Sequence, residues 1–358
     1  MEIHTIFVEP ANYTQDLICH IHQKRGISYS FLKSNSQASN NNLILATAKH
    51  VFDKNSFLKN INFLWYCSNK YDLIIINGYN HFSFIILWLL SFWNPFLLGI
   101  DSDTPFTPQK GLKKIVKHLV LNTFFSNSKV IGLSGGSGKH IELFTNYGMA
   151  IKRIFLMPMM IDNDKFYSHI KNTVLPNNSV MEFIFVGRLV AEKNIQLLIK
   201  SFNKIVSKGY VGKLTIVGNG TLKTELIALA NGNNQIVFEG NLFGNGLITK
   251  YKSSDVLILP SNIEPWGLVV NEALCANVAV ICSNKVGAAN DLIIGPNAGW
   301  VFQDNNQEAL EAQLIYCINN PIEVAEKATN GHNFMKSNWN YKTYENALDN
   351  VIAYVENN

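Results

Sequence analysis

The sequence is poor in cysteine and in charged residues. Its 358 residues include five cysteines, an odd number, and none of them forms a C-x-x-C pair. We therefore expect neither a disulfide framework nor a zinc site, and the pattern favours buried thiols in the reducing cytoplasm. Charged residues make up 16% and the formal net charge is +4, too small to indicate a nucleic-acid partner.

The sequence also lacks a long uninterrupted apolar run. The stretch 73–100 contains no Asp, Glu, Lys or Arg, but several polar residues and Pro95 interrupt it. A membrane-spanning helix needs about 20 mostly apolar residues in one run. We interpret the stretch as one β-α-β unit, with a strand over 72–77, a helix over 82–93 and a strand over 95–100; a spanning helix is the alternative. The first residues show no basic segment followed by an apolar one, so we expect no signal peptide.

Short apolar runs alternate with longer amphipathic segments along the whole chain. This alternation predicts an α/β protein with parallel sheets covered by helices, and the length predicts two domains. A polar segment around 165–180 indicates the boundary. We expect one domain over 1–170, a second over 180–335, and a C-terminal helix over 336–358 that packs back toward the first. Ligands of such sheets bind at the carboxyl ends of the strands, so the cleft between the domains is the expected site.

The first candidate site follows the apolar strand 183–186. Gly187 ends that strand, and Arg188 and Lys193 flank the turn into a helix that begins near Asn194. A helix N-terminus offers free N–H groups and a positive dipole end, and two cations beside it suit a diphosphate. The alternative interpretation is a pair of solvated surface cations.

The second candidate site follows the apolar strand 256–259. Glu264 lies in the loop after it, Gly267 lets a ligand approach the backbone, and Glu272 lies about one and a half turns into the next helix. Glu264 could bond sugar hydroxyls and Glu272 a ribose diol. A capped helix with an exposed Glu272 is the alternative.

Together these segments resemble a known family. Glu264 and Glu272 form an E-x7-E motif, and 187–193 reads G-R-L-x-x-E-K. Their order and spacing are similar to those of the retaining glycosyltransferases of family 4, and further similar segments lie at 216–220, 237–240 and 254–261. The resemblance implies the GT-B fold, in which two Rossmann-like domains face each other across a cleft.

The resemblance also implies roles for individual residues. Arg188 and Lys193 would hold the donor diphosphate, Glu264 the transferred sugar and Glu272 the ribose. The backbone amides around Trp266, Gly267 and Leu268 would bond phosphate or sugar oxygens. The strand end near Gly240 and Asn241 would lie by the base, and Gly187 would be a further donor-binding position. The nucleoside-diphosphate sugar is a substrate, and the family needs no cofactor and no metal.

The N-terminal half carries weaker signals. Members of the family often have a Gly-rich loop near the start, where this chain has the segment 9–13 without a Gly pair. His81 follows the strand 72–77 and is a candidate catalytic residue; a structural loop histidine is the alternative. Asp101 and Asp103 follow the strand 95–100 and are further candidates for the same cleft.

The segment 110–120 predicts a basic amphipathic helix. Lys110, Lys113, Lys114 and Lys117 share one face, and an apolar face adjoins it. Such a helix suits an anionic membrane surface or an anionic lipid-linked acceptor. The alternative is a solvated helix whose apolar face packs on the domain's own sheet.

The sequence thus predicts a metal-independent retaining glycosyltransferase, cytoplasmic or peripheral on the inner face of the cytoplasmic membrane. Its acceptor would be a polysaccharide or lipid-linked oligosaccharide, as in bacterial O-antigen, capsule or exopolysaccharide synthesis. Two alternatives stay open: a non-catalytic binding protein of the same fold, and a sugar-nucleotide epimerase.

Overall fold

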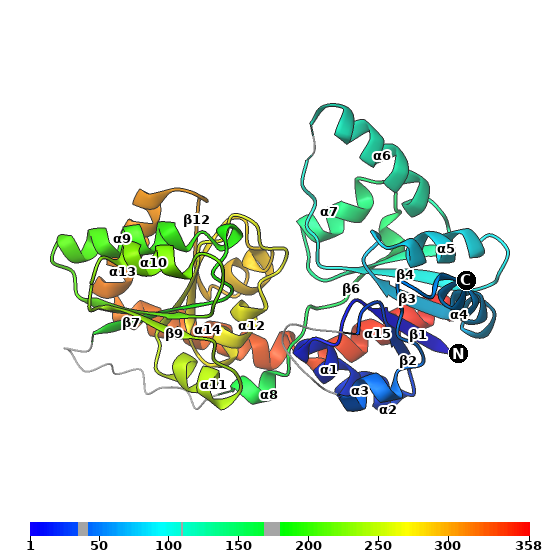
Figure 1. Cartoon of the computed structure of the whole chain (residues 1–358), viewed down its shortest axis with the longest axis horizontal. Helices are drawn as coiled ribbons and strands as arrows, with labels where there is room; N and C mark the ends of the chain where they lie inside the picture. Colours follow the sequence, from blue (N-terminus) through cyan, green and yellow to red (C-terminus); the bar gives the residue numbers. More distant parts are fainter. Residues whose placement is uncertain (35–41, 109, 168–179) are drawn as a thin grey trace. The chain divides into compact units, whose positions relative to one another are not determined.

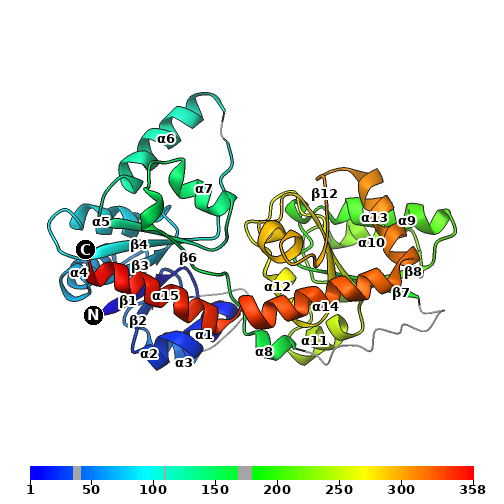
Figure 2. The same cartoon turned by 180° about the vertical axis from the view of Figure 1, so that it is seen from behind.

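The computed structural model describes residues 1–34, 42–108, 110–167 and 180–358. The chain divides into two compact units, drawn in Figures 1 and 2. Unit 1 comprises Met1–Asp162 together with Tyr341–Asn358, and unit 2 comprises Asn163–Asn340. None of the helices in the described ranges is long and apolar enough to cross a membrane.

Unit 1 is built on a parallel sheet of six strands in the order β2-β1-β3-β4-β5-β6. The strands are β1 Ile3–Phe7, β2 Ser28–Phe31, β3 Leu73–Asn77, β4 Leu97–Ser102, β5 Val130–Ser134 and β6 Ile154–Leu156. The helices are α1 Asn12–Leu17, η1 Ile18–His22, α2 Gln23–Arg25, α3 Asn42–Thr47, α4 Phe57–Lys70, α5 Phe82–Leu90, α6 Gly111–Phe125, α7 Lys139–Thr145, η2 Ile151–Arg153 and α15 Tyr341–Glu356.

Both faces of this sheet are buried, as the alternation in β3 shows. Leu73 and Ile75 belong to the apolar cluster that holds Leu348 of α15, whereas Ile74 and Ile76 belong to the cluster on the other face. Successive strand residues point to opposite faces, so a strand buried on both sides is apolar throughout. The last helix of the chain therefore covers one face of unit 1 (Figure 2).

The apolar stretch 73–100 forms the β-α-β unit that the sequence predicted. It contains β3, α5 and β4, and β3 pairs with β4 in parallel, with Leu73 opposite Leu97. The helix ends at Leu90, slightly before the predicted end.

Unit 2 is a second parallel sheet of six strands, in the order β12-β11-β10-β7-β8-β9. The strands are β7 Met181–Val186, β8 Gly212–Val217, β9 Ile236–Gly240, β10 Val256–Leu259, β11 Ala279–Ser283 and β12 Gly299–Phe302. The helices are α8 Asn163–Phe166, η3 Ala191–Lys193, α9 Ile195–Ser207, α10 Lys223–Ala230, α11 Asn245–Lys252, α12 Leu268–Cys275, η4 Ala289–Ile294, α13 Gln307–Asn319 and α14 Pro321–Asn338.

Each sheet reverses its strand order at one place. In unit 1 the first strand lies between β2 and β3, and in unit 2 β7 lies between β10 and β8. The connections to the left and right of such a strand run to opposite faces, which leaves a crevice at the carboxyl ends of the two strands where the order reverses. The fold therefore predicts one binding place after β1 and β3 and another after β7 and β10.

Candidate functional site

The crevice of unit 2 is bounded by the loops that follow β7 and β10. The first loop contains η3 and ends at Lys193, and the second contains Glu264. Lys193 Nζ donates a short hydrogen bond to Glu264 Oε2, and Ser261 Oγ donates to the same oxygen over 3.2 Å. Two charged groups that sequence analysis assigned to one donor are thus in direct contact.

This ion pair is largely shielded from water. The side chains of Lys193 and Glu264 are 15% and 12% exposed. A charge pair in such a place is screened less by salt than a surface pair, and removal of one partner leaves the other partly desolvated. The two charged groups are therefore already in place, and each could exchange its contact with the other for a contact with an incoming ligand.

Backbone and side-chain hydrogen bonds fix the two loops to each other. Asn262 N–H donates to the carbonyl of Glu192 over 2.8 Å, and Asn194 Nδ2 donates to Asn262 Oδ1 over 3.1 Å. Asn194 has a left-handed backbone conformation with φ 49° at the start of α9, which asparagine tolerates better than most residues. Because these bonds join both loops, the relative positions of Lys193 and Glu264 do not depend on their own contact alone.

Three glycines form the neighbouring part of the same sheet edge, at the ends of β7, β8 and β9. Gly187 N–H donates to Val217 over 3.0 Å, and Gly218 N–H donates to Gly240 over 2.7 Å. A Cβ on Gly218 would lie 1.8 Å from the Gly187 carbonyl oxygen. The loops are thus packed backbone against backbone, and the three glycines, which have no side chains, are only partly buried.

Gly267 brings the Glu264 loop against the start of α12. It has φ 98°, and a Cβ there would lie 3.2 Å from Glu264 Cγ and 3.3 Å from Val286. The Glu264 carbonyl accepts a 2.9 Å bond from Gly287 N–H, which holds the loop from the other side. Since Gly267 is the N-cap of α12, the first N–H groups of that helix, including that of Leu268, lack intrahelical acceptors.

The Trp266 side chain belongs to the core of unit 2. It is buried, donates from Nε1 to Asn271 over 3.0 Å, and stacks on Trp339 with ring centroids 5.5 Å apart. A contribution of this residue to a donor site would therefore come from its backbone and not from its ring.

Glu272 lies on α12 and accepts a 2.8 Å hydrogen bond from the Tyr251 hydroxyl. Burial raises the pKa of Glu272 to about 7, and the bond from Tyr251 partly opposes that rise. A carboxyl that titrates near neutrality can both donate and accept hydrogen bonds, which suits a diol.

The remaining predicted donor residues lie on the same edge of the sheet. Arg188 follows Gly187 after β7 and is exposed, and Asn241 follows Gly240 after β9 and is exposed. The structure therefore brings Lys193 and Glu264 into contact and places Arg188 and Asn241 along the same edge, while Glu272 bonds to Tyr251. Within the described ranges, no group of three or more His, Cys, Asp or Glu is placed to hold a metal ion.

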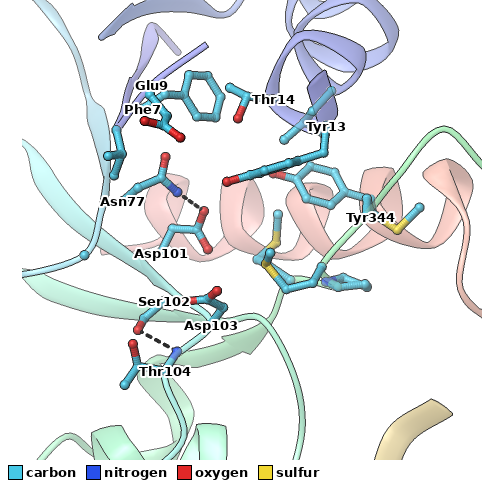
Figure 3. Close-up of a pocket in the computed structure, with 17 residues that line it drawn as sticks. Phe7, Glu9, Tyr13, Thr14, Asn77, Asp101, Ser102, Asp103, Thr104 and Tyr344 are labelled. Atoms are coloured by element: carbon cyan, nitrogen blue, oxygen red, sulfur yellow. Dashed lines mark hydrogen bonds between the residues drawn. The ribbon is translucent and has the colours of Figure 1, made fainter. Parts of the chain in front are cut away.

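The crevice of unit 1 contains a cavity of about 300 Å³ (Figure 3). It is lined by the ends of β1, β3 and β4, by the start of α1 and by residues after β6, and α15 contributes Tyr344. The segment 9–13 stands where the resemblance expects a Gly-rich loop, and it supplies Glu9 and Tyr13 to this cavity. The cavity is thus assembled from chain segments more than 300 residues apart.

The cavity is acidic and rich in hydrogen-bonding groups. Glu9, Asp101 and Asp103 line it, and its described lining includes no Lys, Arg or His. Asn77 Nδ2 donates a short bond to Asp101 Oδ2 (Figure 3). Burial and then the nearby charge of Asp103 raise the pKa of Asp101 to about 7. Carboxyl and amide groups in a cavity suit a ligand with several hydroxyl groups.

His81, the catalytic candidate that follows β3, lies at the start of α5. It is the N-cap of α5, and its Nδ1 accepts a 3.2 Å bond from Ser83 N–H. Burial lowers the pKa of His81. The end of β3 contributes Asn77 and Gly78 to the cavity instead, so capping α5 is the role that the structure shows for this histidine.

Asn77 and Tyr344 are two polar residues of this cavity that sequence analysis did not single out. Asn77 is the last residue of an apolar strand, and its position there is a signal that could have found it. Tyr344 carries no such signal, because it lies on an amphipathic helix near the end of the chain. Only the packing of α15 on unit 1 brings it to Asp101. Burial, and then the charge of Asp101, raise the pKa of Tyr344.

The Asp101 carboxyl predicts a pH dependence of stability. Its pKa is about 7 in the fold and 3.8 ordinarily, so between these values the folded chain holds a proton that the unfolded chain has lost. The stabilisation that the proton on Asp101 gives the fold is fully present below pH 3.8, the ordinary pKa, and is lost as pH rises through about 7. Asp101→Asn cannot ionise, and we expect its stability relative to the original chain to increase by ~2 kcal/mol between about pH 5 and about pH 8.

Urea unfolding of both proteins at the two pH values measures this gain. Asp349→Asn, at an exposed position on α15, controls for the change in net charge. A gain for Asp101→Asn that is equal at both pH values would contradict an elevated Asp101 pKa.

Comparison with known proteins adds to this geometry. Residues 166–333 match the family described as "Glycosyl transferases group 1". The chain is 35% identical over 125 residues to an uncharacterized glycosyltransferase, MJ1607, of Methanocaldococcus jannaschii, which is 34% of this chain and 32% of that protein. It is 26% identical over 253 residues to the capsular polysaccharide biosynthesis glycosyltransferase CapM of Staphylococcus aureus, which is 68% of this chain and 58% of that protein. Both alignments therefore span less than two thirds of the relative.

The fold has close neighbours among solved structures. The Anabaena protein Alr3699/HepE, solved in complex with UDP, superposes with a TM-score of 0.78 at 14% identity, over 99% of this chain and all of that one. At this identity the likeness concerns the fold. It confirms the predicted α/β glycosyltransferase fold of the GT-B type, with two parallel six-stranded sheets.

Proposed function

We propose that the protein is a retaining glycosyltransferase that uses a nucleoside-diphosphate sugar, because residues 166–333 match the family described as "Glycosyl transferases group 1". The observation that carries this proposal is the shielded contact of Lys193 with Glu264 in the crevice of unit 2. A cation and a carboxylate held together there match the two ends of the donor's reacting bond, a diphosphate and a sugar.

In this proposal the donor lies along the carboxyl edge of the sheet in unit 2. Lys193 and Arg188 neutralise the diphosphate, and the N–H groups at the start of α12 bind its oxygens or those of the sugar. Glu264 accepts hydrogen bonds from the sugar hydroxyls, and Glu272 bonds the ribose diol. The low backbone of Gly187, Gly218 and Gly240 gives the nucleotide room to approach.

The transfer step needs little from the protein beyond charge and position. The bond between the anomeric carbon and the diphosphate oxygen breaks, and a bond to the acceptor hydroxyl oxygen forms on the same face of the sugar. The hydroxyl proton passes to the departing phosphate oxygen. Lys193 and Arg188 stabilise the charge on the leaving diphosphate, which is the role that a divalent metal would otherwise fill. We propose on this ground that transfer is metal-independent.

The acceptor in this proposal is a saccharide, part of a polysaccharide or of a lipid-linked oligosaccharide. The acidic cavity of unit 1 supports this, because its carboxyl, amide and hydroxyl groups suit several sugar hydroxyls. The likeness to a capsular polysaccharide enzyme supports a role in bacterial surface polysaccharide synthesis. A lipid-linked acceptor would place the protein at the inner face of the cytoplasmic membrane.

The test is a panel of UDP, GDP and ADP sugars offered to the purified protein in EDTA. We expect one nucleotide class to stabilise the protein, by about 2.7 kcal/mol when the ligand is at 100 times its dissociation constant. We also expect release of the nucleoside diphosphate, with the freed sugar retaining its anomeric configuration by NMR.

Three results would decide against this proposal or part of it. Stabilisation by none of the sugar nucleotides would contradict the donor site. Release only after a divalent metal is added would contradict metal independence alone. Conversion of the sugar to an epimer without release of the nucleotide would indicate an epimerase.

A further inference from the structure

The first part of α6 is exposed on its apolar side as well as on its polar side. Its apolar residues there are exposed by 75% at Leu112, 56% at Ile115, 53% at Val116, 63% at Leu119 and 46% at Val120. Their spacing of three and four residues puts them in one stripe along the helix. The alternative considered from the sequence, that this face packs on the sheet of unit 1, is therefore wrong.

The helix is nevertheless held firmly at its other end. Leu121 and Phe125 are buried, and the Phe125 ring lies 5.5 Å from that of Phe144 and 5.7 Å from that of Tyr79. Figure 1 shows α6 standing out from the rest of unit 1. The second half of α6 is therefore anchored in the core of unit 1, and the apolar stripe lies on the half that is not.

Lysines adjoin the apolar stripe. Lys113, Lys114 and Lys117 lie within one hundred degrees of arc beside it, at the helical rotation of about 100° per residue, and Lys110 is the N-cap residue just before the helix. The segment 104–141 contains no Asp or Glu. Four cations without a neutralising acid in this segment indicate an anionic partner.

An apolar groove of about 530 Å³ continues the stripe. Val116 and Val120 of α6 line it together with Tyr79, and Lys113 and Lys117 also border it. A surface that joins hydrocarbon to cations over one helix fits an amphiphile, whose acyl chains and anionic headgroup would each meet their complement.

We propose that α6 binds the surface of a bilayer that contains anionic phospholipid, with the stripe among the acyl chains and the lysines among the headgroups. The inference deepens the proposed function, because it names the surface that would bring the enzyme to a lipid-linked acceptor. The inference can be tested separately from donor binding, which is measured in solution and concerns unit 2.

Two other classes of partner fit the same surface less well. A nucleic acid would meet the lysines but would leave the five apolar residues in water. A soluble protein, or a second copy of this chain, would cover the stripe, but it would also have to place carboxylates at fixed positions opposite the lysines. A bilayer has no such requirement, because its acyl chains and anionic headgroups accept the stripe and the lysines at any lateral position.

The experiment is flotation of the purified full chain with vesicles. One set is phosphatidylcholine alone, and the other is phosphatidylcholine with an equal amount of phosphatidylglycerol. We expect binding to the mixed vesicles and little to the neutral ones. Each lysine near an anionic surface strengthens partitioning by roughly fivefold, so Lys113→Gln/Lys114→Gln should weaken binding by roughly 25-fold. Raised salt should weaken it further.

A second variant tests the apolar stripe. Ile115→Ser/Leu119→Ser removes two of the most exposed apolar side chains and should weaken vesicle binding by at least tenfold without lowering the melting temperature, because both positions are exposed. The matched controls lie on unit 2: Lys200→Gln/Lys252→Gln at exposed positions, and Ile227→Ser/Ile322→Ser, exposed by 47% and 71% in the original chain. We expect both controls to bind like the original protein.

Equal binding to neutral and mixed vesicles, or undiminished binding by both α6 variants, would overturn the proposal. So would a concentration-dependent dimer that Ile115→Ser/Leu119→Ser abolishes while vesicle binding is absent. Stabilisation of the original chain by a sugar nucleotide is measured in a separate experiment. Absence of vesicle binding is therefore distinguishable from absence of donor binding.

Discussion

Replacement of Gly218 by alanine is expected to lower the free energy of unfolding of unit 2 by ~3 kcal/mol or more. Gly218 has φ 136°, and an added Cβ would lie 1.8 Å from the carbonyl oxygen and 2.9 Å from the carbonyl carbon of Gly187. Those atoms are backbone, so they cannot turn away like a flexible side chain. The loops after β7 and β8 would have to separate, and the Gly218 N–H bond to Gly240 would weaken with them.

Gly209→Ala is the matched control for this substitution. Gly209 has φ 91°, also in the left-handed region, but a Cβ there would meet nothing within 4 Å. Its cost should be limited to backbone strain, about 1 kcal/mol. Calorimetry of both variants measures the difference. Equal melting temperatures for Gly218→Ala and Gly209→Ala would show that the loops are not packed as described.

We expect Gly218→Ala also to weaken donor binding. The separation of the two loops would displace Gly187 and the adjoining η3, which ends at Lys193. A sugar nucleotide that stabilises the original chain should therefore stabilise this variant less, while Gly209→Ala should keep the full response.

The local sequence predicted the strands and most of the donor edge because these depend on short segments. An apolar strand followed by a glycine and a polar turn marks the carboxyl edge of a parallel sheet, and Gly187 and Lys193 both lie there. The contact of Lys193 with Glu264 joins residues 71 positions apart. The sequence did not predict this contact; the assignment of both residues to one donor came from the resemblance to a family and not from the pattern of apolar residues.

The residues that local patterns could not place depend on tertiary packing. Tyr344 reaches the cavity of unit 1 because α15 returns to that unit, and an amphipathic pattern does not say which sheet a helix covers. Trp266 lies beside the donor edge in sequence, but the stacking of its ring on Trp339 turns the side chain into the core. His81 follows a strand as a catalytic residue would, yet its ring nitrogen caps the next helix.

The exposure of α6 is a further case of this kind. The sequence predicted a basic amphipathic helix but left two partners open for its apolar face. The structure shows that only the second half of the helix is covered by unit 1. Which face of an amphipathic helix meets solvent is decided by what else packs nearby, and that is not encoded in the helix itself.

Substitution of Lys193 by methionine tests the central claim, that the shielded ion pair of unit 2 binds the donor. Methionine keeps much of the apolar stem of lysine and removes the charge. Loss of one preorganised hydrogen-bond donor to developing negative charge typically costs about 10²–10³ in rate, and we expect a loss of that size in sugar transfer or donor hydrolysis. Lys208→Met removes the cation of another ion pair, Lys208 with Glu311 over 2.8 Å, which links α9 to α13. Its rate should stay within about twofold of the original because its partner is not at the carboxyl edge of the sheet.

The most direct measurement is a double-mutant cycle on that rate, with Lys193→Met, Glu264→Gln and the double variant assayed with the same sugar nucleotide. If the two side chains act on one donor as a unit, the double variant loses little more than the worse single variant. Single variants that keep the original rate while melting at lower temperatures would contradict the account, because the pair would then only stabilise the fold.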